Sequence, residues 1–135
     1  GDSAAKYKII VFDDPECTYC GKLHPEMKKV IEQRSDIAFF IKMFPLAMHP
    51  HAKSKAQTIV CSKLQGEHKK ALAFLEESLA KKSLPAPACT TDVVDKNIAL
   101  AKKFYIASTP TLIMPDGLVL PGFKKAEKII ASIKE

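Results

Sequence analysis

The chain contains 135 residues with a formal net charge of +6, and 47% of its residues are hydrophobic and 27% charged. This length suits a single domain with its own core. No apolar run approaches the roughly 18 residues that a membrane-spanning helix needs. All cations but one are lysines, and tryptophan is absent. Because base recognition relies on arginine and aromatic stacking, the composition does not favour nucleic-acid binding.

The first third of the sequence predicts a strand, a helix and a second strand. Residues 7–12 form a β-branched and aromatic run that ends at "DDP", which indicates a buried strand. From about Cys17 to Arg34, apolar residues recur at helical spacing. Residues 37–43 again read as a buried strand. This order predicts a right-handed crossover between two parallel strands.

The middle of the chain predicts a helical insertion over about residues 50–90. Helical spacing covers residues 52–64 and 67–80, with Gly66 between them, and a proline-rich segment follows over residues 83–89. Another helix is predicted over residues 92–105. Its inward face is expected to carry Val94, Ile98, Ala101 and Tyr105.

The last part predicts a β-hairpin and a terminal helix. Residues 111–114 and 118–123 flank Pro115-Asp116-Gly117, a strong turn signal because glycine supplies the positive φ that tight turns need. A final helix from about Lys124 should turn Ala126, Ile129, Ile130 and Ile133 inward.

Two cysteines three residues apart, Cys17 and Cys20, lie where the first strand gives way to the helix. Such pairs occur in redox, haem and zinc sites. Haem attachment needs a histidine directly after the second cysteine, whereas residue 21 is Gly. A zinc site needs four ligands, and the further candidates are His24, His49 and His51. A structural disulfide here is disfavoured, because so short a loop removes little entropy from the unfolded chain.

The helix start favours redox chemistry at this pair. Unpaired amide N–H groups and the positive end of the helix dipole favour the thiolate of Cys17. We therefore expect Cys17 to attack a substrate disulfide and Cys20, one turn later, to resolve the mixed disulfide. Three acids before the pair oppose this effect by repelling a thiolate: Asp13, Asp14 and Glu16.

Pro25 and the second cysteine pair complete the local signals. Pro25 falls inside the predicted helix, where it removes one backbone hydrogen bond and should kink the helix just after the cysteine pair. Four cysteines permit three pairings, and the spacing suggests that the distant Cys61 and Cys89 pair with each other. Such a bond is expected mainly in an oxidising compartment. It would stabilise the fold by roughly 3 kcal/mol on the chain-entropy model.

Several separated motifs together resemble the thioredoxin superfamily and, within it, the catalytic domain of the DsbC/DsbG disulfide isomerases. These motifs are "CTYCGKLHPEM", "FFIKMFPLA", "VCSK", "ACTTDV" and "STPTLIMPDGLVLPGF". The resemblance covers nearly the whole chain. It implies an α/β thioredoxin-like fold, a βαβ unit plus a β-hairpin and C-terminal helix, with the helical insertion between the parallel strands and the hairpin. Residues 1–135 would form one catalytic domain, without the N-terminal dimerisation domain of those isomerases.

The resemblance also implies roles for individual residues. Cys17 would be the attacking cysteine and Cys20 the resolving one, and Cys61 and Cys89 would form a structural disulfide. Pro110 would be a cis-proline opposite the active site. Substrate main chain would pair beside it, with substrate-binding residues Thr18, Tyr19, Thr109 and Pro110. Three further side chains would either line an apolar groove beside the cis-proline or belong to the core: Phe44, Pro45 and Met48.

Departures from the family pattern concern redox tuning and proton transfer. The dipeptide between the cysteines is Thr18-Tyr19, which lacks the glycine usual in the isomerases. Val11 lies six residues before Cys17, where thioredoxins carry a buried aspartate. Proton transfer to and from Cys20 would then need water or another group such as His24. The more usual expectation for His24 is an exposed helix face.

The function implied is a thiol-disulfide oxidoreductase that isomerises or reduces disulfides in extracytoplasmic proteins, without a metal or other cofactor. Its partners would be disulfide-containing or unfolded proteins and a thiol reductase that restores the dithiol. A net oxidant like DsbA and a metal-binding module using Cys17 and Cys20 are the alternatives. The start "GDSAAKYK" contains no signal core, so we expect a processed or excised periplasmic chain. It should be monomeric unless an N-terminal dimerisation domain precedes it.

Overall fold

The β-branched run near the start of the chain forms the central strand of the sheet. The computed structural model describes all residues, Gly1–Glu135. Strands β1 (Tyr7–Asp13) and β2 (Ile37–Met43) pair in parallel, and β3 (Thr111–Ile113) pairs antiparallel with β1. Strand β4 (Val119–Pro121) adds to β3 as the second arm of the hairpin. The sheet order is therefore β2-β1-β3-β4.

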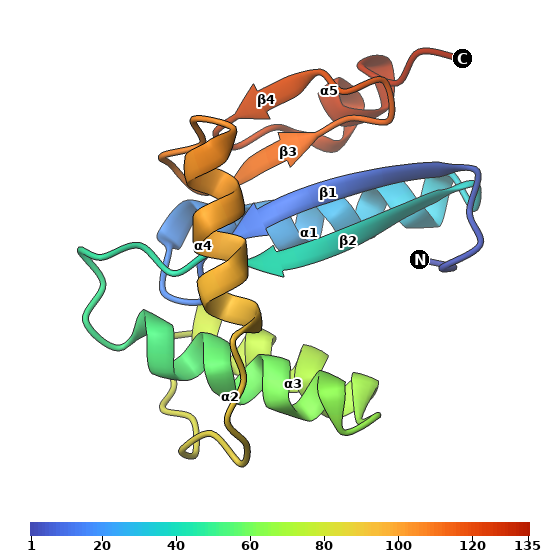
Figure 1. Cartoon of the computed structure of the whole chain (residues 1–135). Helices are drawn as coiled ribbons and strands as arrows, with labels where there is room; N and C mark the ends of the chain where they lie inside the picture. The colour runs from blue at the N-terminus through green and yellow to red at the C-terminus, as the bar shows by residue number, and fades with distance from the viewer.

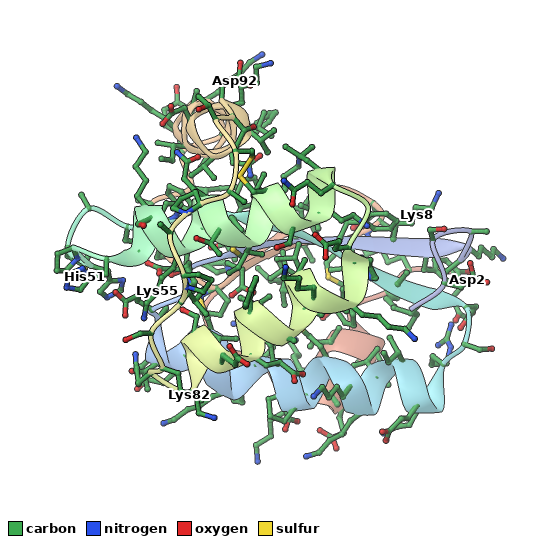
Figure 2. The ribbon with its side chains drawn as sticks, turned by 90° about the horizontal axis from the view of Figure 1, so that it is seen from below. Asp2, Lys8, His51, Lys55, Lys82 and Asp92 are labelled. Carbon is green, nitrogen blue, oxygen red and sulfur yellow. A yellow bond between two sulfur atoms is a disulfide. The ribbon has the colours of Figure 1, made fainter.

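Helices cover both faces of this sheet (Figures 1 and 2). Helix α1 (Thr18–Gln33) packs with the short α5 (Ala126–Ala131) against one face, and α4 (Val93–Lys103) crosses the other. The core on the α1 face contains buried apolar residues from both helices and the sheet, among them Ile9, Val11, Leu23, Val30, Leu112 and Ile129. Burial of this apolar area is the main stabilising term of the fold.

The helical insertion packs at the C-terminal end of β2. Helices α2 (Ala52–Leu64) and α3 (His68–Leu79) are separated at Gly66, whose φ of +80° suits glycine because it has no Cβ. The two helices share a second core cluster with β2 and α4, which includes Met43, Ile59, Leu75 and Val94. The insertion therefore packs on the Met43 end of β2, whereas residues along the rest of this strand line a groove with α1, α2 and α3.

The predicted fold class is confirmed: a βαβ unit, a helical insertion, a β-hairpin and a C-terminal helix follow in the expected order. The predicted inward position of Tyr105 is wrong, because its side chain is 94% exposed. Helix α4 ends at Lys103, and Tyr105 then adopts a positive φ of 58°. The Ile106 N–H bonds back to the Ala101 carbonyl, a left-handed helix ending that buries Ile106 in place of Tyr105.

None of the helices has both the length and the apolar character that crossing a membrane requires.

Candidate active site at the Cys17–Cys20 dithiol

Cys17 caps the N-terminus of α1. Its backbone is extended (φ −82°, ψ 126°), and its Sγ accepts a hydrogen bond from the Cys20 N–H at 3.4 Å. The sequence folds in this way because Pro15 ends the strand segment and helical residues begin at Thr18. The first sulfur therefore faces an amide N–H at the positive end of the helix.

The two sulfurs are unequal in access. Both cysteines are free thiols, and Cys17 retains 8% exposure while Cys20 has 0%. Cys20 lies one turn inside the helix, where its Sγ accepts the Asp14 N–H at 3.4 Å. Burial, followed by the negative charge of Asp13, raises the pKa of the Cys20 thiol far above its ordinary value. An incoming disulfide therefore meets Cys17 first.

A segment far away in the sequence lies directly against Cys17. The Thr109–Pro110 peptide bond is cis, and the Cys17 thiol donates to the Thr109 carbonyl oxygen at 3.5 Å. Strand β3 begins at the next residue, Thr111, and its antiparallel pairing with β1 places this turn beside the helix start. The two predicted site segments thus meet in space.

The predicted substrate-contacting residues differ in exposure. Thr18 and Tyr19 are exposed beside Cys17, and the Lys22 Nζ lies 4.9 Å from the centroid of the Tyr19 ring. Met48 is likewise exposed. Phe44 instead belongs to the core, where its ring meets Phe12 edge to face at a centroid distance of 6.1 Å.

His24 does not lie on an exposed helix face, and this expectation is corrected by the structure. Its side chain is only 13% exposed, and its Nε2 lies 2.6 Å from Oδ2 of the fully buried Asp13. The other Asp13 oxygen, Oδ1, is buried without a hydrogen-bond partner. Sequence reasoning treated Asp13 only as a source of repulsion. The sequence contained one signal for the position of His24. His24 follows Cys20 by four residues, so both side chains lie on the same face of the helix.

The neighbouring Asp14 organises the loop before the dithiol. Its Oδ1 accepts the Glu16 N–H at 2.8 Å, and its Oδ2 accepts the Leu46 N–H at 2.9 Å and lies 2.6 Å from His49 Nδ1. The buried carboxylate is thus satisfied by hydrogen bonds. His24 and His49, both weighed as zinc ligands, each pair with an aspartate, and nowhere do three or more His, Cys, Asp or Glu side chains gather closely enough to hold a metal ion.

The insertion holds the same loop from the other side. The Ser78 hydroxyl, fully buried at the end of α3, donates to the Pro15 carbonyl at 2.6 Å. The Lys81 Nζ donates to the Glu16 carbonyl at 2.6 Å, and the Lys55 Nζ lies 3.2 Å from a carboxylate oxygen of Glu16. The helical insertion therefore positions the residues that precede Cys17.

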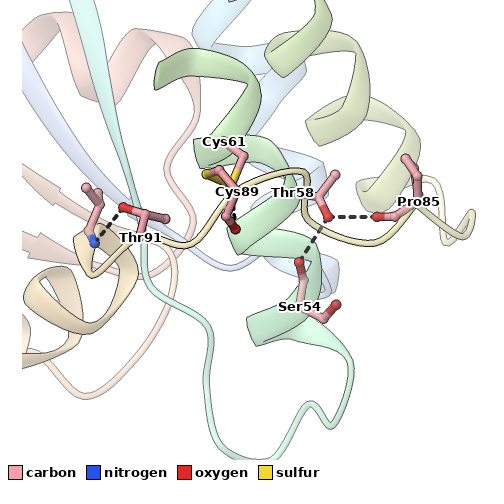
Figure 3. Close-up of a disulfide and its surroundings, with 7 residues drawn as sticks. Ser54, Thr58, Cys61, Pro85, Cys89 and Thr91 are labelled. Carbon is pink, nitrogen blue, oxygen red and sulfur yellow. Dashed lines mark hydrogen bonds between the residues drawn. A yellow bond between two sulfur atoms is a disulfide. The ribbon is translucent and has the colours of Figure 1, made fainter. Parts of the chain in front are cut away.

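A disulfide joins α2 to the segment before α4 (Figure 3). It links Cys61 to Cys89, with a Cα–Cα distance of 5.6 Å and a sequence separation of 28 residues. Close by, the Thr58 hydroxyl bonds the carbonyl of Pro85 at 2.7 Å, which ties the proline-rich segment to the same helix. The disulfide lies in the insertion, apart from the Cys17–Cys20 dithiol.

Known proteins resemble this chain over its whole length. Residues 2–135 match the family described as thioredoxin-like domain. The thiol:disulfide interchange protein DsbC of Salmonella typhimurium is 28% identical over 131 residues, which cover 96% of this chain and 52% of that protein. The chain spans about half the length of the curated relatives it matches.

Solved structures agree with this assignment. A disulfide interchange protein from Neisseria gonorrhoeae has a TM-score of 0.73 at 28% identity, with 94% of this chain and 85% of that chain covered. Pseudomonas aeruginosa DsbA2 shares the fold with a TM-score of 0.84 at 21% identity, with 98% and 89% covered. The match over residues 2–135, together with the fold, shows that the chain belongs to the thioredoxin-like domain family.

Proposed function

We propose that the chain is the catalytic domain of a thiol-disulfide oxidoreductase that isomerises or reduces disulfides in extracytoplasmic proteins. The observation that carries this proposal is the unequal dithiol at the start of α1. Cys17 is reachable and capped by an amide N–H, whereas Cys20 is fully buried one turn later. This arrangement gives one sulfur for attack and one for resolution.

The exchange begins when the Cys17 thiolate attacks one sulfur of a substrate disulfide. A bond forms between Cys17 and that sulfur, and the other substrate sulfur leaves with the electron pair and takes up a proton. In isomerisation, a second substrate thiolate attacks the mixed disulfide and returns Cys17 unchanged. In reduction, Cys20 attacks Cys17, which leaves a Cys17–Cys20 disulfide and a substrate reduced by two electrons.

The surroundings of Cys17 support binding of an extended substrate segment. The backbone at Thr109 and Pro110 lies beside the attacking sulfur at the start of β3. Main-chain pairing at such a position tolerates many sequences, as a protein with varied substrates requires. The exposed Thr18 and Tyr19 follow Cys17 at the start of α1, where they would supply side-chain contacts to such a segment.

The proposed compartment is extracytoplasmic, and in a bacterium periplasmic. Its support is the Cys61–Cys89 disulfide, since such bonds persist mainly in oxidising environments. A reducing cycle there consumes two electrons for each substrate disulfide, so the proposal includes a separate thiol reductase that restores Cys17 and Cys20.

The test compares wild type with Cys17→Ser and Cys20→Ser in insulin reduction and in reactivation of a scrambled disulfide protein. Cys17→Ser should lose turnover in both assays. Cys20→Ser should accumulate mixed disulfides, visible on non-reducing gels, because the resolving thiol is gone. Full turnover by Cys17→Ser would refute the proposal.

The same dithiol run in the opposite direction would make the chain a net oxidant. Thr109 before the cis-proline and Tyr19 between the cysteines favour the isomerase or reductase direction, by resemblance to the DsbC/DsbG isomerases. The two roles differ in the direction of electron flow and therefore in reduction potential.

A further inference from the structure

A carboxylate with a free oxygen is buried at the Cys20 end of β1. Asp13 has no exposed surface, and its Oδ2 pairs with His24 Nε2 at 2.6 Å. Its Oδ1 is buried and accepts no hydrogen bond. Because an unpartnered buried carboxylate oxygen costs free energy, a protein keeps one most readily where it serves the chemistry.

Two neighbours connect this carboxylate with Cys20. The backbone of the following residue, Asp14, donates its N–H to Cys20 Sγ at 3.4 Å. The partner of Asp13, His24, follows Cys20 by four residues, so both side chains lie on one face of α1. Asp13 is close enough for its charge to raise the pKa of the Cys20 thiol, the second cause after burial.

Cys20 has to lose a proton before it can attack, because the thiolate is the nucleophile. The side chain has no solvent contact, so proton loss to a neighbouring protein group is faster than loss to bulk water. Val11, one strand repeat earlier on the same face, is a fully buried hydrocarbon and provides no acceptor. Asp14 already accepts two backbone N–H groups and pairs with His49.

We propose that the Asp13–His24 pair accepts the proton that Cys20 loses when it resolves the mixed disulfide. Asp13 is the acceptor through its free Oδ1, and His24 is a positioning residue that holds Oδ2 and connects the buried pair to the surface. The inference rests on the proposed exchange function and deepens it.

The step balances without an added oxidant or reductant. The Cys20 S–H bond breaks and its proton passes to the Asp13–His24 pair. The Cys20 thiolate then attacks Cys17 Sγ, a Cys17–Cys20 bond forms, and the bond between Cys17 and the substrate sulfur breaks. The leaving substrate thiolate carries away the electron pair, and the pair returns its proton to that thiolate or, through the partly exposed His24, to solvent.

The electrostatic surroundings of the pair come from several elements. His24 lines a groove between α1, β2 and the insertion, together with lysines from α1 and β2 and a glutamate from α3. Asp14, Glu16 and His49 lie on the loops beside the dithiol. The titratable side chains that neighbour the thiol or line this groove with His24 are Cys17, Asp14, Lys8, Lys28, Lys42, Lys63, His68 and Glu76.

The experiment mixes the reduced protein, its Cys61–Cys89 bond intact, with excess dithiobis-nitrobenzoate in a stopped-flow spectrometer between about pH 6 and pH 9. Attack by Cys17 releases one coloured thiolate in a phase that depends on reagent concentration. Attack by Cys20 on the mixed disulfide releases a second thiolate at a rate independent of reagent concentration, provided the excess is kept low enough that reagent does not capture Cys20 first. The two phases therefore report the two sulfurs separately.

Asp13→Asn should slow the second phase roughly 100-fold at pH 7, the scale of general-base catalysis, and leave the first phase nearly unchanged. The variant's second phase should then rise about tenfold per pH unit, because its thiol loses the proton directly to solvent. The wild-type rate should rise less steeply. His24→Gln should slow the second phase about tenfold, since the carboxylate remains.

A surface substitution of the same chemistry, Asp95→Asn, should change neither phase, because the exposed Asp95 carboxylate pairs with Lys53 at the surface and contacts neither the dithiol nor the Asp13–His24 pair. An unchanged or faster second phase in Asp13→Asn would overturn the inference, since a purely repulsive Asp13 would speed resolution when neutralised. If Asp13→Asn fails to fold, His24→Gln decides. Absence of the first phase in wild type would instead refute the proposed function.

Discussion

Glu26 joins α1 to the start of α5, 100 residues later in the chain. Its Oε1 accepts the Ala126 N–H at 3.1 Å, and its Oε2 lies 2.9 Å from the Lys29 Nζ. The first bond satisfies one of the amide groups that every helix start leaves open. The hydrogen bond from Lys29, followed by that from Ala126, lowers the pKa of the Glu26 carboxyl below its ordinary value of 4.5.

This lowered pKa predicts a pH dependence of stability at the acid end. The folded state binds the Glu26 proton less readily than the unfolded state, so the stabilisation is present above about pH 4.5 and is lost as the pH falls through the folded pKa. Urea unfolding should show wild type more stable than Glu26→Gln at pH 7, with the gap narrowing below about pH 4. Glu32→Gln on the same helix controls for loss of a surface charge. A gap that stays constant into acid would contradict the assignment.

The sequence singles out candidate site residues only where spacing defines them. Cys17 and Cys20 stand out because two cysteines one turn apart follow a strand end. Asp13 and His24 did not stand out, because their contact joins a strand end to a helix face and depends on how α1 packs on the sheet. The relevant burial arises from tertiary packing, which local sequence reasoning does not contain.

At the scale of elements, α3 supports the active-site loop through one buried bond. The Ser78 hydroxyl donates to the Pro15 carbonyl at 2.6 Å, and this carbonyl precedes Cys17 by two residues. Ser78→Ala would leave the carbonyl without this donor inside the protein. We expect a loss of about 1–3 kcal/mol in the free energy of unfolding, measured by urea titration, and slower insulin reduction because the loop is less well held.

Ser132→Ala is the matched control for this prediction. Ser132 also donates to a carbonyl, that of Lys128 at 2.7 Å, but this bond lies at an exposed helix end, where water replaces it. Equal destabilisation by the two substitutions, or full activity and stability of Ser78→Ala, would show that α3 does not hold the loop.

Most element boundaries were predictable because strong local signals mark them. The strand at 37–43 and the helix at 52–64 match the structure, and Gly66 separates the two insertion helices as expected. The end of α4 was not predictable from apolar spacing, which continues to Tyr105. The left-handed turn at that residue buries Ile106 instead, and the choice between the two is made by the packing of Ile106 with Phe12 and Phe44.

At the scale of the whole molecule, the strand order explains how the site is assembled. Because β3 lies next to β1 in the order β2-β1-β3-β4, the turn before β3 meets the helix start after β1. Cys17 and Thr109, 92 residues apart, come into contact in this way. The antiparallel hairpin and the βαβ unit were readable from the sequence. Their meeting at Cys17 was expected only from the family resemblance, because no local pattern specifies which strand pairs with β1.

The most direct measurement is the equilibrium reduction potential of the Cys17–Cys20 pair against a glutathione series, with Cys61–Cys89 intact. The proposed isomerase or reductase role predicts reversible exchange and a potential at or below about −180 mV. A potential near the strongly oxidising value of about −120 mV would contradict that role and indicate a net oxidant. A pair that fails to exchange with glutathione at all would contradict the thiol-disulfide oxidoreductase activity itself.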